Sequence, residues 1–433
     1  MKKAGYLFLL FIALTSCSQS AIDNNIVQVK NGQFIKDGKP YYFVGTNFWY
    51  GAILASQGEG GNRDRLYKEL DELKSIGIDN LRILVGSDGE RGVNSKIEPT
   101  LQTSPGVYND TLLTGLDFLL VEMGKRDMKG VLYLNNSWEW SGGYSQYLAW
   151  AGYGKAPIPN VDGWEAYMTY VTQFQQSDSS KTLFANYVRD IVSRTNSITG
   201  IPYKDDPTIF SWQIANEPRA FSDGNKEFFA QWIGDVARLI KSIDSNHMVS
   251  TGSEGKHGCE KDIVLFERIH SYTAIDYLNI HIWPYNWQWI TKDSISENLE
   301  TAIVNTEEYI DEHLVVAKKL NKPVVIEEFG FPRDEFKFAI GSSVSSRDSY
   351  YDFVFDIVLN NAKNEGLLAG CNFWGWGGFA RPNSNNPFWK KGDDYCGDPA
   401  QEPQGQNSVF AKDSSTINII KEYNQKIGET IKR

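Results

Sequence analysis

The chain has 433 residues, of which 41% are hydrophobic and 13% aromatic, and its formal net charge is −11. The length suits one large α/β domain or two smaller ones, with enough apolar residues for a sizeable core. The acidic balance, without a basic stripe, argues against a nucleic-acid partner and agrees with simple solubility.

The amino terminus has the pattern of a targeting segment. Lys2 and Lys3 precede an apolar run at 6–14 that is too short to span a membrane as a helix. The run ends in Leu-Thr-Ser-Cys at 14–17, which resembles the lipobox of bacterial lipoproteins. We therefore predict a signal peptide over 1–16, a polar tether over 17–26 and a lipid anchor on Cys17 in the cell envelope, outside the cytoplasm. An ordinary secretory signal is the alternative.

Strands and helices alternate along residues 27–433. Apolar, β-branched runs predict strands at 40–48, 78–85, 130–135, 208–215, 247–251, 277–282, 323–328 and 368–374. Helical periodicity predicts helices at 62–76, 111–123, 182–194, 226–243, 295–320, 346–364 and 416–427. Eight strands alternating with helices predict a single (β/α)8 TIM barrel.

Two long segments interrupt this alternation. Residues 136–178 follow the third predicted strand and are rich in Trp, Tyr and Gly. Residues 377–408 are rich in Gly, Pro, Asn and Gln, and we expect them to form a long loop over the catalytic face of the barrel.

The cysteines and short motifs limit the covalent chemistry. If Cys17 is lipidated, Cys259, Cys371 and Cys396 remain, so at most one disulfide forms and the sequence does not choose the pair. We find neither a Cys-His spacing typical of a metal site nor a Gly-rich phosphate loop. We therefore expect no metal and no other cofactor.

Polar and aromatic residues follow the predicted strands. In barrel enzymes the active site is built at the carboxyl ends of the strands, and such residues at so many ends are improbable in a purely structural barrel. The candidates are Trp49, Arg82, Asn135, Asn136, Asn216, Glu217, Glu254, His281, Trp283, Glu328 and Trp374.

Glu217 and Glu328 are the most informative pair. Each stands at the carboxyl end of an apolar run that predicts a buried parallel strand. Burying a carboxylate at such a position costs free energy, so its presence indicates a functional role. In a closed barrel the two can face each other. Two facing carboxyl groups are the minimum equipment for cleaving a glycosidic bond, so the pair predicts a glycosidase.

Several motifs carry a resemblance to a known family. With N-E-P-R-A at 216–220 and E-E-F-G at 327–330, the chain resembles glycoside hydrolase family 5 over residues 27 to 420. Finer stretches resemble the endo-β-1,4-mannanase branch of that family: G-T-N-F-W-Y-G (45–51), P-G-V-Y-N-D (105–110), S-T-G-S-E-G (250–255), H-I-W-P-Y-N-W (281–287) and N-F-W-G-W-G-G (372–378).

The resemblance implies roles for the two carboxyl groups. It assigns Glu217 as the general acid/base and Glu328 as the nucleophile, with Arg82 holding the nucleophile ionised. The chemistry agrees, because a neighbouring ionised carboxylate raises the pKa of a proton donor. Strand alternation sends Glu327 and Glu328 to opposite sides, so only one of them can face the cleft from the strand. The family pattern places the nucleophile directly before an aromatic-Gly pair, here Phe329-Gly330, which implies that Glu327 is the spare carboxylate.

The resemblance also implies substrate-binding residues. Asn216 is expected to hydrogen-bond the substrate 2-hydroxyl, although an Asn that forms a turn is the alternative. His281 matches a family histidine of the site, with a structural histidine as the alternative. Trp283 stands where many relatives carry Tyr, which leaves its contact open. Asn136 and Glu254 are further candidates at the strand ends.

The aromatic residues leave three questions open. Trp374 is expected to form the platform beneath the sugar, and Trp376 competes for that role. Trp49 either lines the same subsite or packs the barrel mouth. A cluster in the long segment either stacks along a polysaccharide or belongs to an amphipathic helix over the barrel; its members are Trp138, Trp140, Tyr144, Tyr147 and Trp150.

Together these patterns predict a monomeric, retaining endo-β-1,4-mannanase whose partner is a β-mannan polysaccharide: mannan, glucomannan or galactomannan. Another family 5 β-glycanase, such as an endoglucanase, is the first alternative. A non-catalytic glycan-binding lipoprotein is the second, and the intact pair of glutamates argues against it, because a binding module has no need of both.

Overall fold

The computed structural model describes residues 26–90, 92–93 and 95–431. The predicted signal peptide, the lipid-anchor residue Cys17 and the tether up to residue 25 lie outside these residues. No helix in the described part of the chain has the length and apolar character needed to cross a membrane.

Eight parallel strands form one sheet in the order β10-β9-β8-β5-β4-β13-β12-β11. Their bounds are β4 Phe43–Asn47, β5 Asn80–Leu84, β8 Lys129–Tyr133, β9 Ile209–Gln213, β10 Met248–Ser250, β11 Leu278–Ile282, β12 Val324–Phe329 and β13 Leu368–Phe373. The edge strands meet through the His281 N–H, which donates to the Glu254 carbonyl (3.1 Å), and the Asp276 N–H, which donates to the Val249 carbonyl (2.8 Å). The nearly closed sheet is the predicted (β/α)8 barrel.

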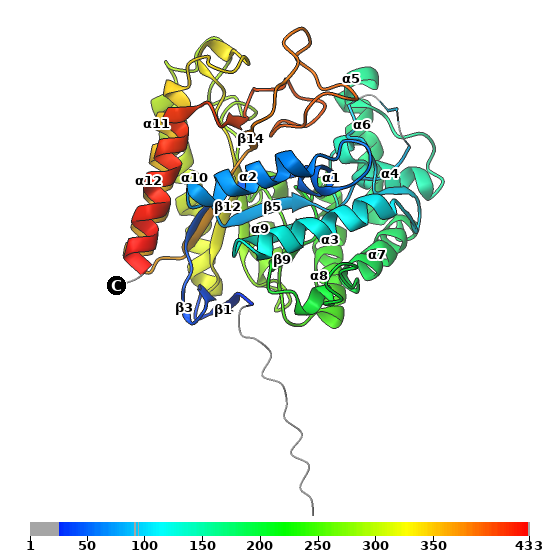
Figure 1. The fold of residues 1–433 in the computed structure, drawn as a ribbon. Coiled ribbons are helices and arrows are strands. Elements are labelled where there is room, and N and C mark those ends of the chain that lie inside the picture. The colour runs from blue at the N-terminus through cyan, green and yellow to red at the C-terminus, as the bar shows by residue number, and fades with distance from the viewer. Residues whose placement is uncertain (1–25, 91, 94, 432–433) are drawn as a thin grey trace, which may run out of the picture.

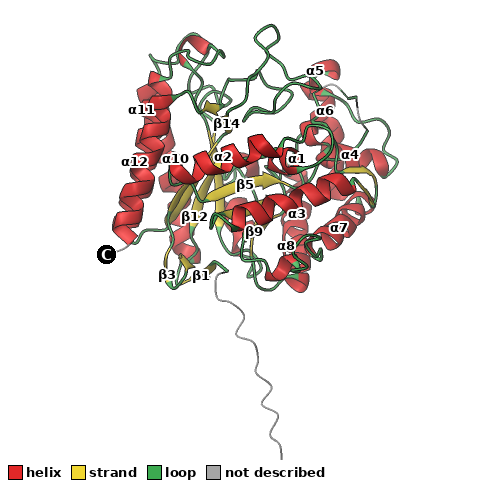
Figure 2. Ribbon diagram, in the orientation of Figure 1, coloured by secondary structure: helices red, strands yellow, loops and turns green. Residues whose placement is uncertain are grey.

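Helices cover the outside of this sheet (Figures 1 and 2). One follows each barrel strand: α2 Arg63–Ser75, α3 Asp110–Gly124, α7 Asp178–Val192, α8 Lys226–Ile243, α9 Ile263–Ser271, α10 Leu299–Leu320, α11 Ser345–Lys363 and α12 Ser414–Ile431. Seven of the eight were predicted. Helix α9 was not predicted; it lies between the fifth and sixth barrel strands, in a stretch to which the sequence assigned no element.

Helix α2 illustrates how sequence produces these elements. The Asn62 side chain accepts a hydrogen bond from the Arg65 N–H (3.0 Å) and caps the amino terminus of the helix. Leu66, Leu70 and Leu73 recur at helical spacing and are all fully buried. The apolar stripe packs toward the barrel, so the helix is held by packing as well as by its cap.

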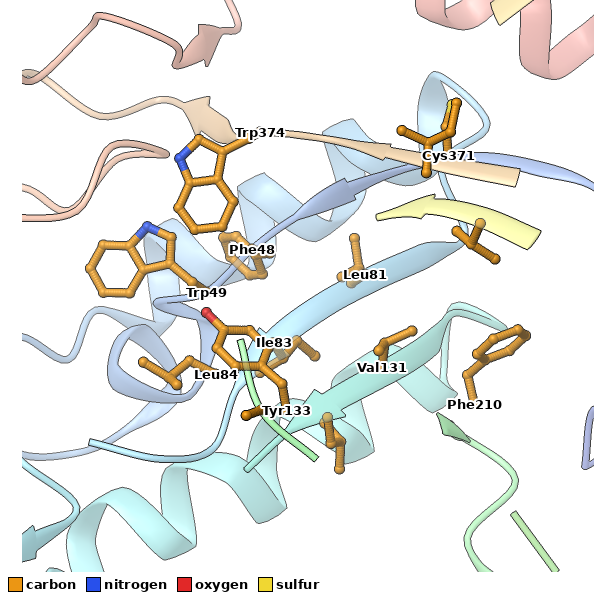
Figure 3. Packing of buried hydrophobic residues seen from close by; sticks show 14 of the residues in the cluster. Phe48, Trp49, Leu81, Ile83, Leu84, Val131, Tyr133, Phe210, Cys371 and Trp374 are labelled. Atoms are coloured by element: carbon orange, nitrogen blue, oxygen red, sulfur yellow. The ribbon is translucent and has the colours of Figure 1, made fainter. Parts of the chain in front are cut away.

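The strands are buried along their whole length, because helices cover their outer faces and side chains fill the inside. Figure 3 shows part of this core, with Leu81, Ile83, Val131 and Phe210 among the buried side chains. This double burial explains why the strands read as continuous apolar runs rather than as alternating ones.

A small antiparallel sheet closes the amino-terminal end of the barrel. It consists of β1 (Gln28–Lys30), β2 (Gln33–Lys36) and β3 (Lys39–Pro40). The Phe34 ring lies 5.0 Å from that of Phe210 and 5.2 Å from that of Tyr277. The predicted first strand at 40–48 therefore begins only at Phe43, because Lys39–Pro40 pairs with β2.

The carboxyl end of the barrel carries the irregular segments. The first loop holds α1 (Gly51–Ala55), and a hairpin of β6 (Gln102–Ser104) and β7 (Val107–Tyr108) follows β5. The segment 136–178 forms a lobe with α4 (Gly143–Trp150), α5 (Pro159–Asp162) and α6 (Trp164–Val171). After β14 (Trp376–Gly378), the long loop runs above the barrel toward α5 and α6 before β15 (Val409–Phe410) (Figure 1).

Cys259, Cys371 and Cys396 are all buried and free, so these three residues form no disulfide. Burial raises the pKa of each thiol, which keeps them protonated.

Candidate active site

The backbone brings Glu217 and Glu328 to the same end of the barrel. Glu328 lies near the end of β12, where it is in register with His281 of the neighbouring strand β11. Glu217 follows β9 with a φ of 51°, a left-handed conformation that is uncommon for a residue other than Gly. Its N–H donates to the Gly252 carbonyl (2.9 Å). A side chain at position 252 would meet the Ala215 carbonyl at 1.8 Å, so this close approach requires Gly.

The two carboxyl groups meet at His281. Its Nδ1 lies 2.9 Å from Glu217 Oε1 and 3.4 Å from Glu328 Oε2. One oxygen of each carboxyl group and a nitrogen of the ring all lie within 4.8 Å of one another. The side chains are 9% (Glu217), 3% (Glu328) and 0% (His281) exposed, so the pair is largely shielded from bulk solvent.

Arg82 binds several members of this cluster at once. Its guanidinium donates to Glu328 Oε1, to Asn216 Oδ1 (2.8 Å) and to Asn47 Oδ1 (3.1 Å). Its Nε donates to Gln213 Oε1 (2.8 Å). The side chain is fully buried, so a fixed positive charge lies beneath Glu328, where the resemblance placed it.

Glu327 points to a different environment. Its carboxylate accepts hydrogen bonds from the Tyr277 hydroxyl (2.9 Å) and from the Gln213 side chain. It is fully buried and does not line the catalytic cavity. The structure therefore separates the two neighbouring glutamates as strand alternation predicted.

Burial is the main cause of the pKa shifts at the site. It raises the pKa of Glu217, while Arg219 and a hydrogen bond from Trp138 act in the opposite direction. It also raises the pKa of Glu328, against the charge of Arg82. The pKa of His281 is lowered by burial and by Arg82, so its ring is neutral at physiological pH. Two buried carboxyl groups this close do not both ionise readily, which favours one shared proton.

A cavity of about 390 Å³ opens at these residues. Its lining combines aromatic faces with carboxyl and amide groups, a typical mixture for a ligand site. The lining residues are Trp138, Glu139, Trp140, Asn160, Trp164, Asn216, Glu217, Arg219, Glu254, Trp283, Asn286, Trp287, Glu328, Trp374, Pro399, Gln401 and Glu402.

Trp374, not Trp376, lies in the cavity wall. The Trp374 ring is in edge contact with Trp140 (6.4 Å) and Trp283 (6.1 Å), which also line the cavity. Trp376 is fully buried, and its Nε1–H donates to Glu69 Oε2 (2.8 Å). Of the two competing platforms, only Trp374 is placed to meet a substrate.

Trp138 and Trp283 contact the acid/base candidate directly. The Trp138 Nε1–H donates to Glu217 Oε2 (2.5 Å). A hydrogen bond from Trp283 also lowers the pKa of Glu217. Trp283 therefore lies beside Glu217 in the cavity wall, and its contact with the substrate stays open.

Four predicted substrate-binding residues do not line the cavity. Arg82 and His281 are fully buried and bind the two carboxyl groups, Arg82 through Glu328 and His281 through Glu217. Trp49 is 2% exposed, and its Nε1–H donates to the Gly397 carbonyl (3.0 Å), so it packs the barrel mouth. Asn136 is fully buried, and its Oδ1 accepts from the Trp138 N–H (3.0 Å) and from the Asn216 side chain (3.3 Å). Asn136 therefore positions two cavity residues instead of meeting the substrate itself.

The aromatic cluster of the long segment 136–178 also falls into two groups, residues that line the cavity and residues that pack in the core. Trp138 and Trp140 line the cavity. Tyr144 and Tyr147 of α4 are fully buried, and Trp150 is half-buried against the core, as an amphipathic helix over the barrel predicts. The helix interpretation therefore holds for Tyr144, Tyr147 and Trp150, whereas stacking on a polysaccharide stays a prediction for Trp138 and Trp140.

Glu254 lies in the cavity with a partner that the sequence analysis missed. The guanidinium of Arg219 donates to Glu254 Oε2 through its Nε (2.7 Å) and a second nitrogen. Burial raises the pKa of Glu254 to about 7, against the charge of Arg219. Arg219 follows Glu217 by only two residues, and this spacing could have identified it as a residue of the site.

The long loop contributes two further cavity residues, Gln401 and Glu402. The Asp398 carboxylate anchors the loop by accepting hydrogen bonds from the N–H groups of Gly405 (2.8 Å) and Asn407 (2.8 Å). Gln401 Oε1 and Glu402 Oε2 are buried with no hydrogen-bond partner in the protein. Burial raises the pKa of Glu402 to about 8. The loop was predicted to cover this face, but nothing in its composition singled out these two side chains.

Within the described part of the chain, one group of three side chains could hold a metal ion, namely Glu217, His281 and Glu328. The guanidinium of Arg82 already provides positive charge at Glu328. The carboxyl groups therefore do not depend on a metal ion for charge compensation.

A (β/α)8 barrel with two buried carboxyl groups facing a cavity at the carboxyl ends of its strands has the architecture of a glycoside hydrolase. Aromatic walls and amide groups around the pair suit a sugar ring, which offers apolar faces and many hydroxyl groups. The fold and the site together define this class of enzyme.

Comparison with known proteins identifies the family. Residues 24–432 match the model of the "GH family 5 beta-mannosidase-like" family, so the chain belongs to the mannosidases of glycoside hydrolase family 5. It is 32% identical to the putative mannan endo-1,4-beta-mannosidase 9 of Oryza sativa subsp. japonica, over 80% of this chain and 82% of that protein. It is also 32% identical to mannan endo-1,4-beta-mannosidase 1 of Solanum lycopersicum, over 85% and 86% of the two chains.

Solved structures give the same result. The family 5 mannosidase from Rhizomucor miehei superposes with a TM-score of 0.86 at 32% identity, over 94% of this chain and 99% of that one. A mutant of that enzyme in complex with mannosyl-fructose superposes with a TM-score of 0.87 at 31% identity, over the same shares of the two chains.

Proposed function

We propose that the protein is a retaining β-1,4-mannan hydrolase that works by double displacement. The observation that carries the proposal is the proximity of the Glu217 and Glu328 carboxyl groups, which have oxygens within 4.8 Å of each other. Retaining enzymes keep their two carboxyl groups about 5–5.5 Å apart, whereas inverting enzymes leave roughly 6.5–9.5 Å for a water molecule.

The surroundings support one assignment of roles. Arg82 donates directly to Glu328, which favours the ionised form of that carboxylate. The proton shared by the pair then resides on Glu217. Glu328 attacks the anomeric carbon while Glu217 gives its proton to the leaving glycosidic oxygen. In the second step, Glu217 takes a proton from water, the resulting hydroxide adds to the anomeric carbon, and the bond to Glu328 breaks.

The substrate class follows from the family. Relatives that are 32% identical are named mannan endo-1,4-beta-mannosidases, which supports mannan, glucomannan or galactomannan as substrates and cleavage of internal bonds. Assays of reducing-sugar release from galactomannan, glucomannan, cellulose and xylan test this. Activity on cellulose alone would identify an endoglucanase, and binding without hydrolysis would identify a glycan-binding protein.

One observation favours a second mode of action, the release of mannose from chain ends. The loop after β14 lies over the barrel (Figure 1), and its half-buried residues Gln401 and Glu402 line the cavity. A covered cavity suits the end of a chain better than the middle of one. Viscosity of a galactomannan solution separates the modes: internal cleavage lowers it steeply per bond broken, whereas terminal cleavage releases mannose with little change.

On the sequence alone, we propose that a lipid anchor on Cys17 attaches the enzyme to the cell envelope. Acyl chains supply about 0.8 kcal/mol of membrane affinity per buried methylene. Replacement Cys17→Ser should move the enzyme from the membrane fraction to the soluble fraction at unchanged specific activity. A variant that remains fully in the membrane fraction would exclude the lipid anchor. Gel filtration tests the proposed monomer.

A further inference from the structure

Trp164 is unusual among the tryptophans of the described chain. The residue is 54% exposed, whereas the others are buried or half-buried. A single exposed apolar side chain needs no explanation by itself, but this one belongs to the wall of the catalytic cavity. Its solvent-facing ring is therefore continuous with the site described above.

The ring lies on the side of the acid/base candidate. Trp164 is in edge contact with Trp138, at 5.9 Å between ring centroids and 84° between planes. The other edge of Trp138 reaches Glu217 through the 2.5 Å hydrogen bond from its Nε1–H. The general acid of a glycosidase protonates the leaving oxygen, so the sugars released as the leaving group lie on its side. Trp164 thus flanks the path of the leaving group.

The position of Trp164 is fixed. It is the first residue of α6, and Tyr167, one turn later, donates its hydroxyl proton to the Ser137 carbonyl (2.5 Å), next to Trp138 in the chain. The Trp138 ring stacks on Tyr167 at 6.4 Å. A ring held in this way loses little conformational freedom on binding, which favours it as a contact surface.

A polar group accompanies the exposed ring. Asn160 of α5 lines the same cavity, and its side chain donates to the Ser95 hydroxyl (3.1 Å), which orients the amide. An aromatic face beside an amide matches a pyranose ring, which has an apolar face of C–H groups and hydroxyls at its edge. These two residues come from the lobe at 136–178, outside the barrel strands.

We propose that Trp164 is a specificity-determining residue that stacks on a β-1,4-linked hexose unit on the leaving-group side of the cleaved bond. The ring contacts a sugar of the leaving group. It should therefore increase the affinity only for substrates whose leaving group contains such a sugar. The assignment of the leaving-group side rests on the proposed function, because it depends on Glu217 as the general acid.

The test compares substrates that differ in the leaving group. The ratio of kcat/KM for mannohexaose to kcat/KM for 4-nitrophenyl β-mannoside should fall about five- to tenfold in Trp164→Ala, the effect of losing one aromatic stacking contact. Trp164→Phe should restore most of the ratio. Phe228→Ala is the matched control, since Phe228 of α8 is 44% exposed and lies outside the cavity lining; it should leave the ratio unchanged.

Binding provides an independent readout. Calorimetric titration of Glu328→Ala with mannohexaose, with and without Trp164→Ala, should show weaker binding by a similar factor when the ring is absent. If the wild-type enzyme hydrolyses neither substrate but Trp164 still strengthens mannohexaose binding, the proposed function is wrong and the proposed sugar-binding site at Trp164 is retained. If neither the ratio nor the affinity depends on Trp164, the inference is wrong.

Discussion

The two ends of the same barrel are built from opposite chemistry. At the amino-terminal end, Phe34, Phe210 and Tyr277 pack against one another under a small sheet. At the carboxyl end, Arg82 and a cluster of buried carboxyl groups face a cavity. The first arrangement lowers the free energy of the folded state by burying apolar surface. The second keeps charge away from water, which is costly and is tolerated only because each charge has a partner.

The contrast shows that a single strand contributes both to the apolar core and to the catalytic cavity. Along β12, Val324, Val325 and Ile326 pack in the core, and Glu328 lies in the cavity wall. Glu327 is the transition between the two regions, because its carboxyl group faces Gln213, Tyr277 and the Arg82 Nε (3.8 Å) rather than the cavity. Substitutions along this strand should therefore separate effects on stability from effects on turnover.

The largest expected effect is at the cavity end. Glu217→Ala should lower turnover of mannan by about 10²–10⁴-fold, the usual contribution of a general acid/base, and Glu328→Ala should lower it at least as much. The melting temperature of Glu217→Ala should stay close to that of the wild type, because it removes a buried carboxyl group whose pKa is raised by burial. That of Glu328→Ala should fall, because the buried Arg82 loses a carboxylate partner. Steady-state kinetics and thermal melts check both.

Glu327→Ala is the neighbouring control for these variants. Its partners Gln213 and Tyr277 lose their hydrogen bonds, so we expect a lower melting temperature and substantial activity in the folded protein. If folded Glu327→Ala were inactive while Glu328→Ala remained active, the nucleophile would have been assigned one residue too far along the strand.

The opposite behaviour is expected at the amino-terminal end. Phe210 is fully buried, and Phe210→Ala should lower the free energy of unfolding by about 3–5 kcal/mol. Because Phe210 lies outside the cavity lining, kcat of the folded fraction should stay within about twofold, a change of about 0.4 kcal/mol in the barrier. Urea unfolding and kinetics at low temperature measure the two quantities. A large loss of kcat without unfolding would show that the two ends are coupled.

A smaller effect concerns the pH dependence of stability. Burial raises the pKa of Glu402 to about 8, compared with roughly 4.3 in an unfolded chain. Between these values the folded state holds a proton that the unfolded state has released, so this group makes stability fall as the pH rises through that window.

Glu402→Gln removes this titration. The melting temperature of the variant relative to the wild type should therefore be higher at pH 8 than at pH 5, by about 1–3 °C. Melting curves at the two pH values measure the difference. A difference that does not change with pH would mean that Glu402 does not titrate in this window.

How far the sequence predicts the structure also differs between the two regions. The barrel strands and most helices were predictable, because burial on both faces produces apolar runs and amphipathic stripes that local reading detects. Glu217 and Glu328 were predictable because a carboxylate at the end of such a run is conspicuous. The small sheet at 28–40 was not, since its strands are two to four residues long.

The parts of the site that come from loops were harder to predict. Gln401 and Glu402 enter the cavity only because Asp398 folds the loop back on itself, and no local pattern encodes that contact. Trp49 and Asn136 lie at strand ends like true cavity residues, but neighbouring side chains cover them. Which strand-end residue meets the cavity depends on long-range packing that a pattern along the chain does not record.

The stereochemistry of hydrolysis tests the central claim most directly. Glu217 and Glu328 have carboxyl oxygens within 4.8 Å of each other, which supports the proposed retaining mechanism, and that mechanism passes through a glycosyl-enzyme. Proton NMR during the first minutes of hydrolysis of a mannooligosaccharide should show the β-anomer of the new reducing end first, with the α-anomer appearing later by mutarotation. The α-anomer as the initial product would mean inversion and would contradict the double-displacement mechanism.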